Sequence, residues 1–512
     1  MERYITLKLP DPLGSDSMVK LCSMSSLITI EKITLPLPSD DDNRADDQRI
    51  RDVLGLDQLE IPLSVLRNIP SQAGSELSCI IGRTTHGNTL IDISAGSLFS
   101  VALDLGSTNL VAALYDNVSG CVVAEAKVVN PQIRFGSDIL TRMHCSMSGK
   151  AEEVNKCLMD GVDTVINTLS HDAGINRHEI HALAAAGNTV MSHYFLGLDI
   201  SRIPVSPFVP VVRKPGFFKA SDLHIGIHPE ALLYVFPNTG IYVGGDIVAG
   251  ILASGMYESE EPCVLIDVGT NAEIVIGCRD WLLAGAGAAG PALEEGIAGI
   301  GKRAETGIIY DIDIRDRGIE CRTFDNAPPQ GICGSGMVSL IYELYRTGII
   351  GNDGRLNSGH KGVDILNGGY AFTFSCGSGD GLIIQQTEID NFLRSKAAMF
   401  TLLLVMLRSV GLRFSDIKKI YVAGALGNGI HVRKAVGIGM LPDWPASRII
   451  PMGNSSLKGA LMLLGDSSLL EKEDKITEGI TYKHMHDDPE FMREFSGAIF
   501  IPHTNPELLK IQ

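Results

Sequence analysis

The chain has 512 residues and a formal net charge of −17 at pH 7, since 43 lysines and arginines stand against 60 aspartates and glutamates. Hydrophobic residues make up 45% and charged residues 20%, an ordinary globular composition that excludes wholesale disorder. The acidic balance excludes nucleic acid as the main partner, because a phosphate backbone is bound by a positive surface.

Nothing in the sequence predicts a membrane span or an exported protein. The most apolar stretch, residues 397–407, is shorter than the run of about 20 apolar residues that crosses a bilayer. The first residues, MERYITLKLPDP, lack the apolar core of a signal peptide. We therefore expect a soluble cytoplasmic protein.

The ten cysteines are scattered, with no two closer than twelve positions and no C-x-x-C pair. This pattern excludes local ligand sets for zinc or iron–sulfur clusters and favours buried reduced thiols. A site assembled from distant cysteines or across two subunits remains an alternative. The thirteen histidines show no ligand set either; His484 and His486 lie close together but lack obvious partners.

In chain order, residues 1–29 are expected to be irregular and residues 30–98 to form a small α/β domain. A strand-like Ile28–Ile30 precedes a polar run, and a helix is expected at Asp46–Leu54. Aspartates at its start favour helix initiation, because they face the positive end of the helix dipole. Short apolar strands, separated by polar segments, complete this domain.

A first lobe is expected over residues 99–258. Val101–Asn109 reads VALDLGSTN, which predicts a strand, an aspartate and a small-residue turn. Two more strands, ending near Val129, complete a three-stranded meander. The remaining elements are expected in this order: a helix at 151–169, a strand and turn at 181–191, and a helix that opens at 244.

The same order begins again in a second lobe, expected over residues 259–478. Val264–Ile276 reads VLIDVGTNAEIVI, and Asp267 follows Asp104 by 163 residues. A repeat of this length predicts two related lobes rather than a solenoid. Later elements are a helix opened by the turn at 331–336, a long helix at 390–410, a strand at 419–422 running into a glycine-rich turn at 424–429, and a polar C-terminal tail at 479–512.

The two D-x-G-[ST] turns are the motifs that predict phosphate and metal binding. Backbone N–H groups in a tight glycine turn converge on an anion, and Ser107, Thr108 and Thr270 add hydroxyl donors. Asp104 and Asp267 supply the one or two carboxylates that Mg²⁺ needs beside phosphate oxygens. The turn that begins at Gly424 lets a flat base approach the backbone. Two such turns facing each other would hold a polyphosphate.

With these motifs, the chain resembles the actin/hexokinase/heat-shock-70 ATPase superfamily. Its phosphate-1, phosphate-2 and adenosine motifs match Asp104–Asn109, Asp267–Asn271 and Val422–Gly427. Within it, the chain is most similar to the ATP-dependent reductive activators of corrinoid proteins. That resemblance extends from about Leu35 to Pro502, and its further motifs are Asn130-Pro131-Gln132, Gly136-x-Asp138, Gly187-Asn188-Thr189, the helix opener at Gly244–Gly250, Gly290-Pro291-Ala292, Gly331–Gly336 and Gly424–Asn428.

The resemblance implies an α/β, actin-like (ribonuclease H-like) two-lobed ATPase fold with a small N-terminal α/β domain. It implies an ATPase that binds ATP and Mg²⁺ and helps return a Co(II) corrinoid protein of a methyltransferase system to Co(I). Asp267, Asp104 and Asp246 are the expected catalytic residues, and Asp104 and Asp267 the metal ligands. The implied nucleotide-binding residues are Gly106, Ser107, Thr108, Asn109, Gly269, Thr270, Asn271, Gly334, Ser335, Gly424, Ala425, Gly427 and Asn428.

Two departures from that family pattern have consequences. The iron–sulfur domain that these activators carry has no matching cysteines here, so we expect no cluster in this chain and a separate iron–sulfur electron donor. The alternative is that the chain has kept the ATPase activity and no longer takes a direct part in electron transfer. Ala425 stands where the superfamily often has a second glycine, which should tune the fit of the adenine. A homodimer is an open possibility.

Several of these residues could have a purely structural role instead of a catalytic or binding role. Asp104 and Asp267 could cap their turns, and Asp246 could be a general base, orient a hydrolytic water or cap its helix. Asn188, Gln132 and Asp138 fit a γ-phosphate site or turn and cap roles, and Cys333 fits a packed small residue. The alternative functions are a sugar or polyol kinase and a nucleotide-gated scaffold that binds a corrinoid protein.

Overall fold

The computed structural model describes residues 26–511, apart from positions 36, 72–73, 94–95, 137, 241–242, 270, 288–299, 303–305, 316–317, 367, 377–380, 425–430 and 486–487. The expectations that lie outside the described residues concern residues 1–25 of the irregular segment, Thr270, Gly290–Ala292, residues 425–429 of the glycine-rich turn (with Ala425, Gly427 and Asn428) and His486. The described chain forms two compact units. The N unit holds residues 26–253 and 455–478, and the C unit holds residues 254–454 and 479–511.

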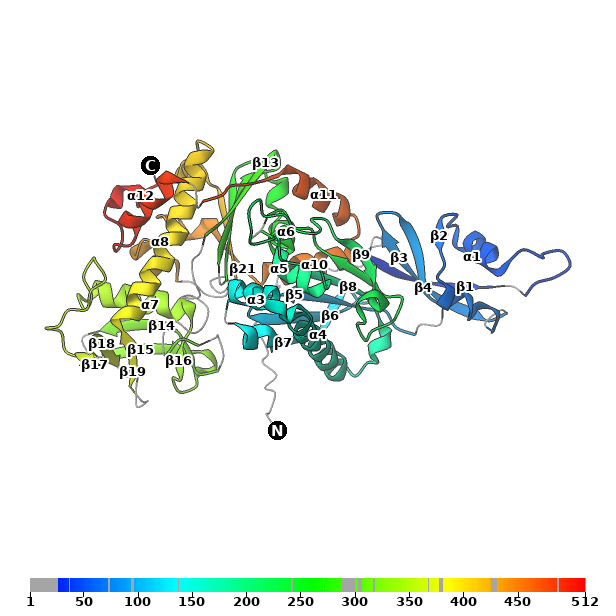
Figure 1. Ribbon diagram of the computed structural model, residues 1–512, viewed down its shortest axis with the longest axis horizontal. Helices are drawn as coiled ribbons and strands as arrows, with labels where there is room; N and C mark the ends of the chain where they lie inside the picture. Colours follow the sequence, from blue (N-terminus) through cyan, green and yellow to red (C-terminus); the bar gives the residue numbers. More distant parts are fainter. Residues whose placement is uncertain are drawn as a thin grey trace. The chain divides into compact units, whose positions relative to one another are not determined.

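The N unit begins with a four-stranded sheet in the order β1-β3-β4-β2, which we call the N-terminal sheet (Figure 1, blue). Its strands are β1 (Ile28–Thr34), β2 (Leu59–Glu60), β3 (Glu76–Thr84) and β4 (Gly87–Asp92). The expected helix at 46–54 is confirmed as α1 (Asp46–Leu54), and α2 (Leu63–Leu66) follows it. Ile50, Leu77 and Leu90 are fully buried in the core of this part.

The second sheet of the N unit, which we call the central sheet, has six strands in the order β7-β6-β5-β8-β10-β9. They are β5 (Phe99–Leu105), β6 (Asn109–Asp116), β7 (Cys121–Val129), β8 (Ile180–Gly187), β9 (Gly216–Lys219) and β10 (Leu232–Val235). The expected antiparallel meander is confirmed by β5, β6 and β7. The helices of this unit are α3 (Ile139–Cys145), α4 (Ala151–Ala173), α5 (Thr189–Phe195), α6 (Gly245–Ser254), α10 (Ser455–Gly465) and α11 (Leu469–Gly479).

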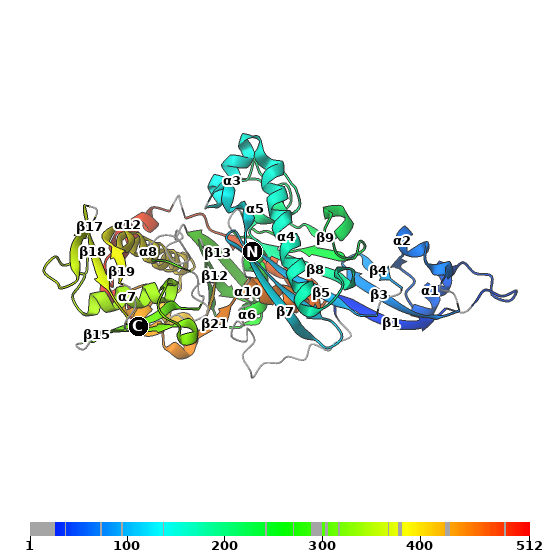
Figure 2. The ribbon, with the colours of Figure 1, turned by 90° about the horizontal axis from the view of Figure 1, so that it is seen from below.

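Helix packing on the central sheet follows the apolar pattern of the sequence. In α4 the residues at helical spacing, Val154, Leu158, Val162 and Val165, are buried in one cluster with Leu103 of β5. The helix lies along β7 and β6 (Figure 2). Helix α10 packs against β5 and β8, so residues 455–478, which the sequence analysis grouped with the second lobe, belong to the N unit.

The C unit has its own six-stranded sheet in the order β21-β20-β11-β12-β13-β22. The strands are β11 (Cys263–Val268), β12 (Ala272–Cys278), β13 (Trp281–Gly287), β20 (Lys419–Gly424), β21 (Ile449–Gly453) and β22 (Ile480–Tyr482). Further strands are β14 (Ile308–Arg315), β15 (Gly318–Thr323), β16 (Gly331–Ile332), β17 (Val363–Leu366), β18 (Gly369–Phe374) and β19 (Leu382–Gln385). The helices are α7 (Gly334–Arg346), α8 (Gln386–Ser409), α9 (Val432–Gly437) and α12 (Pro489–Ala498).

The internal repeat expected from the sequence is confirmed by topology. The strand order β7-β6-β5-β8-β10 of the N unit recurs as β13-β12-β11-β20-β21 in the C unit. In both, three antiparallel strands come first, and a long helix (α4 or α8) leads to a fourth strand parallel to the first. Such a crossover places the carboxyl ends of the first and fourth strands at one edge. The structure therefore contains two related α/β lobes.

Residues 479–511, expected as a polar tail, are built into the C unit where the structure describes them. Strand β22 pairs in parallel with β13, and α12 packs beside the long helix α8 (Figures 1 and 2). The fully buried Lys396 of α8 donates from Nζ to the carbonyls of Ala498, Phe500 and Pro502 at 2.6, 2.6 and 2.9 Å. Three acceptors around one ammonium fix this segment to the helix.

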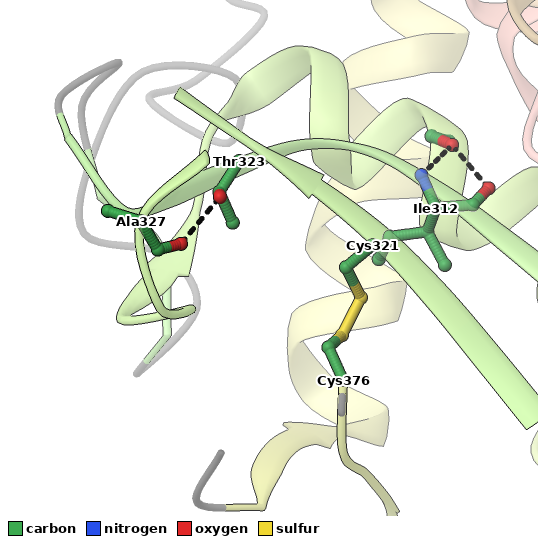
Figure 3. The surroundings of a disulfide bond; sticks show 6 residues. Ile312, Cys321, Thr323, Ala327 and Cys376 are labelled. Carbon is green, nitrogen blue, oxygen red and sulfur yellow. Dashed lines mark hydrogen bonds between the residues drawn. A yellow bond between two sulfur atoms is a disulfide. The ribbon is translucent and has the colours of Figure 1, made fainter. Parts of the chain in front are cut away.

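One pair of cysteines differs from the expected reduced thiols. Cys321 of β15 and Cys376 form a disulfide in the C unit, with their Cα atoms 5.6 Å apart (Figure 3). The bond ties the β14–β15 hairpin to the segment after β18, 55 residues further along the chain. The other cysteines of the described chain are free, and most are buried.

We predict that Cys321→Ala lowers the free energy of unfolding of oxidised protein by about 2–4 kcal/mol, because the crosslink restricts the unfolded chain. Denaturant unfolding with and without a reductant measures this. Cys278→Ala, a buried free cysteine of the same unit, is the control, and its effect should not depend on reductant. Equal stability of the Cys321 variant and the parent without reductant would contradict the crosslink.

Among the described residues, no helix has both the length and the apolar character needed to cross a membrane. Even the apolar run at 397–407 is buried within α8 against the rest of the C unit.

Candidate nucleotide-binding site

Asp104 lies at the carboxyl edge of the central sheet, one residue before the end of β5. It is half-buried and opposite Ala186 of the parallel neighbour β8, while Leu105 is opposite Gly187. Ser456, in the first turn of α10, donates from Oγ to Asp104 Oδ1 at 3.0 Å. The carboxylate is thereby held at the edge where the first and fourth strands of this lobe both end.

The turn from Gly106 to Thr108 is fixed by hydrogen bonds that its three carbonyl groups accept from other residues. Asn130 donates from Nδ2 to the Gly106 carbonyl at 3.0 Å and from its backbone N–H to the Thr108 carbonyl at 2.9 Å. Arg142 donates from Nη1 to the Ser107 carbonyl. A turn whose carbonyls are all engaged on the protein side can direct its N–H groups to an anion on the other.

Arg142 is a supporting residue that the sequence analysis did not single out. Its side chain is fully buried, its Nε donates to the Gly136 carbonyl at 2.8 Å, and burial lowers the pKa of its guanidinium. It therefore links the turn after β5 to the segment before α3. No local motif marks it, because its partners lie in separate parts of the chain.

Asn188 and Asp246 lie close to this edge in the same unit. Asn188 caps α5, accepting from the Met191 N–H at 3.0 Å. A Cβ on Gly244 would lie 2.4 Å from the Cα of Asn188, so the start of α6 packs directly on the turn after β8. Asp246, in the first turn of α6, accepts from the Ile247 N–H at 2.8 Å. The structure thus brings Asp104, Asn188 and Asp246 to one edge.

Two other candidates are engaged in local structure. Gln132 is fully buried; its Nε2 donates to the Val154 carbonyl at 3.1 Å and its Oε1 accepts from Asn130. Asp138 caps α3 through the Thr141 hydroxyl and N–H, and these two hydrogen bonds lower the pKa of its carboxyl. These contacts match the turn and cap alternatives for both residues.

In the C unit, Asp267 occupies the position in β11 that Asp104 occupies in β5. It is opposite Ala423 of the parallel strand β20, and Val268 is opposite Gly424. The turn that follows is tight, since the Gly269 N–H donates to the Asn271 carbonyl at 2.9 Å. Gly424 is therefore the counterpart of Gly187 in the other lobe.

Asp267 and Gly424 are in close approach. A Cβ on Gly424 would lie 2.5 Å from Asp267 Oδ1 and 2.3 Å from the Val268 carbonyl oxygen, and the residue has a φ of +70°. Only glycine tolerates both the left-handed backbone and this contact. Asp267, expected in the phosphate-2 motif, and Gly424, expected in the adenosine motif, are thereby adjacent in one sheet.

We predict that Gly424→Ala reduces ATP affinity at least about tenfold, because the methyl group must displace the Asp267 carboxylate or the Val268 carbonyl. Isothermal titration with a non-hydrolysable ATP analogue measures this. Gly411→Ala is the matched control: it has φ +71° with no atom within 4 Å of the added methyl. It should cost about 1 kcal/mol of stability and leave affinity unchanged. Equal affinity of both variants would contradict the assignment.

The turn at 331–336 is built against β14. Cys333 precedes α7, its N–H donates to the Ile309 carbonyl at 3.0 Å, and its thiol contacts the Ser335 hydroxyl at 3.1 Å. Cys333 and Ser335 are both buried. Gly334 begins α7, so the backbone here presents the N-terminus of a long helix, which favours an anion.

A buried lysine fixes α9, the helix after the adenosine motif. Lys434 is 4% exposed, and its Nζ donates to Asp311 Oδ1 at 2.8 Å, Asp313 Oδ1 at 3.1 Å and Ser339 Oγ at 2.8 Å. Burial would raise the pKa of Asp311, but hydrogen bonds from Lys434 and Ser339 outweigh it and hold that pKa below 3.8. Lys434 thus joins α9 to β14 and α7.

The donor set fits a hydrated Mg²⁺ with phosphate. Asp104 and Asp267 are half-buried carboxylates at strand ends, each followed by a glycine turn, and a Cβ at Gly424 would fill the space beside Asp267. Mg²⁺ takes one or two carboxylates and keeps several waters. In each lobe by itself, the carboxylate is a ligand that suits Mg²⁺, and the amides of the turn suit phosphate oxygens. Such an arrangement is that of an actin-like ATPase.

Comparison with known proteins supports the actin-like ATPase class and also identifies the family of this chain. Residues 261–511 match the model of the C-terminal domain of RACo, the ASKHA domain, and residues 99–259 match the RACo middle region. The actin-like ATPase fold expected from the sequence is confirmed. The chain belongs to the RACo family of corrinoid-activating proteins.

Three relatives support this. The corrinoid activation enzyme RamQ of Eubacterium limosum is 30% identical over 80% of this chain and 72% of its own. The [Co(II) methylated amine-specific corrinoid protein] reductase of Methanosarcina barkeri is 22% identical over 76% of this chain and 74% of its own. The solved reductive activator for corrinoid, iron-sulfur protein has a TM-score of 0.89 and 31% identity, over 95% of this chain and 81% of its own.

Proposed function

We propose that this protein is an ATPase that activates a corrinoid protein of a methyltransferase system, favouring reduction of its Co(II) centre to Co(I). Similarity to a corrinoid activation enzyme over 80% of the chain carries this proposal. The duplicated Asp-x-Gly strand ends support the ATP-dependent part, because each presents a carboxylate and a glycine turn.

The electron comes from a separate iron–sulfur carrier in this proposal. One electron converts Co(II) to Co(I), and water converts ATP to ADP and phosphate. The nucleotide acts by changing the affinity of the activator for the Co(II) and Co(I) forms of its partner. A ligand can shift such an equilibrium only through this difference in affinity, and the coupling is reciprocal.

ATP hydrolysis rests on positioning and charge, without covalent chemistry. Bound Mg²⁺ would neutralise charge on the phosphates. Asp267 and Asp104 would orient that ion through its waters, and the N–H groups of the two turns would receive phosphate oxygens. Asp246 would orient the attacking water, and the Gly334–Ser335 helix start and the motif from Gly424 would contact the nucleoside. Arg142 and Asn130 act by fixing the carbonyls of the first turn.

ATP hydrolysis by the purified protein, with and without a Co(II) corrinoid protein from the same organism, tests this function. We expect weak basal turnover that rises at least about tenfold with the partner. Turnover that appears only with a pool of sugars and polyols would instead establish the kinase alternative, with Asp246 as general base. Binding of the corrinoid protein without turnover would establish the nucleotide-gated scaffold.

A further inference from the structure

A cluster of two histidines and an aspartate lies in the N unit, away from the nucleotide motifs. Asp92 ends β4 of the N-terminal sheet, His181 is the second residue of β8, and His228 precedes β10. One potential ligand atom from each lies within 4.8 Å of the others. His181 stands six residues before Gly187, about 20 Å along the strand from the carboxyl edge. The cluster is therefore a separate place in the molecule.

The buried histidine of this cluster has unsatisfied polar atoms. His181 is 1% exposed, and neither of its ring nitrogens has a hydrogen-bond partner in the described structure. An imidazole loses its hydrogen bonds to water on burial, which costs about 1–3 kcal/mol per unpaired group. Almost all buried polar groups have a partner, so one with two orphaned nitrogens indicates a missing ligand.

The distances leave room for an ion among the three side chains. His181 Nε2 is 3.7 Å and His228 Nε2 is 3.8 Å from Asp92 Oδ2, too long for hydrogen bonds. Ligands about 2.0–2.1 Å from a tetrahedral zinc ion lie about 3.3 Å apart. The two distances to Asp92 would therefore shorten by roughly half an ångström on binding, and a water would supply the fourth ligand. The two rings, with centroids 5.0 Å apart, already lie side by side.

The surrounding charges favour a cation. Glu179 lies beside His181 and Glu230 beside His228, so two more carboxylates add to the charge of Asp92. The cationic Lys219 pairs with one of these carboxylates, since its Nζ is 3.0 Å from Glu230 Oε2. The Glu230 N–H donates to His228 Nδ1 at 3.3 Å. When Nε2 binds a metal, Nδ1 carries the proton, so metal binding would break this hydrogen bond.

We propose that Asp92, His181 and His228 bind one divalent transition-metal ion, with Zn²⁺ as the ion to test first. Two imidazoles and a carboxylate are a set that Zn²⁺ and its first-row neighbours accept. The ion ties the N-terminal sheet, through Asp92, to the central sheet, through His181. Its role is structural, and it is independent of the proposed ATPase function.

Metal analysis of untagged protein, purified without added metal, tests this site. Inductively coupled plasma mass spectrometry should find about one equivalent per chain, and chelator-treated protein should bind one equivalent of Zn²⁺ or Co²⁺ with a rise in Tm. His181→Asn and His228→Asn should each weaken binding at least about 100-fold, since even loss of a group supporting a ligand costs 10–100-fold. The Co²⁺ absorption spectrum reports nitrogen and oxygen ligation.

His178→Asn is the matched control, because this histidine is exposed and three residues from His181. It should keep the full metal content. If a histidine variant fails to fold, Asp92→Asn replaces it as the conservative test. The proposal is overturned by chelator-treated protein that binds none of Zn²⁺, Co²⁺, Fe²⁺, Ni²⁺ or Mn²⁺, by one equivalent retained in the ligand variants, or by equal loss in the control.

Discussion

Replacing Asp267 with asparagine is expected to reduce corrinoid-stimulated ATP hydrolysis by about 100-fold or more, the loss typical when a preorganised electrostatic group is removed. The substitution keeps the shape of the side chain beside Gly424 but removes the charge that would hold hydrated Mg²⁺. The fold should therefore persist while turnover falls. Phosphate release at saturating ATP, with circular dichroism as the fold check, measures this.

Asp364→Asn is the control for this experiment. Asp364 is an exposed aspartate in β17 of the same unit, and its replacement makes the same change in net charge. Its turnover should equal that of the parent. An Asp267 variant that folds and turns over at the parental rate would show that the aspartate only stabilises its turn, which is the structural alternative for this position.

Replacing Lys434 with methionine is expected to lower the free energy of unfolding of the C unit by about 3–5 kcal/mol, because one partner of a buried charge network is removed. Asp311 would be left buried without its lysine, and Glu343, 3.7 Å from Nζ, would lose the same neighbour. Denaturant unfolding measures this. Lys418→Met is the control: its ion pair with Glu261, at 3.9 Å, is exposed and worth about 0–1 kcal/mol.

The stability difference between parent and Lys434→Met should narrow as the pH falls from 7 toward 4. In the parent, the pKa of Asp311 lies below 3.8, so its contribution is present above that pH and is lost as pH falls through the lowered value. Without Lys434, burial dominates and raises this pKa, so protonation relieves the buried charge earlier. A difference that stays constant over this range would contradict the charge network.

Much of the fold follows from local sequence pattern. Asp104 and Asp267 each lie near the end of an apolar run followed by a small-residue turn, and both runs are confirmed as strands that end one residue later. Their repetition predicts two lobes, because equal patterns select equal strand order. Helix α1 begins at Asp46, where acidic residues favour a start.

Features set by long-range contacts could not be predicted. Helix α10 follows the last strand of the second repeat, yet it packs on β5 and donates from Ser456 to Asp104, 352 residues away in sequence. Arg142 and Lys434 sit on ordinary helices, and only their buried partners reveal them. The metal-binding cluster draws on residues 92, 181 and 228, so no spacing motif marks it.

Formation of Co(I) tests the central claim most directly. The protein would be incubated anaerobically with its Co(II) corrinoid partner and a low-potential electron donor, and Co(II) loss and Co(I) gain followed by electron paramagnetic resonance and visible absorption. We predict that Co(I) accumulates with ATP and Mg²⁺, and that the parent without ATP and the Asp267→Asn variant leave cobalt as Co(II). Equal Co(I) formation with and without ATP would contradict an ATP-dependent activator.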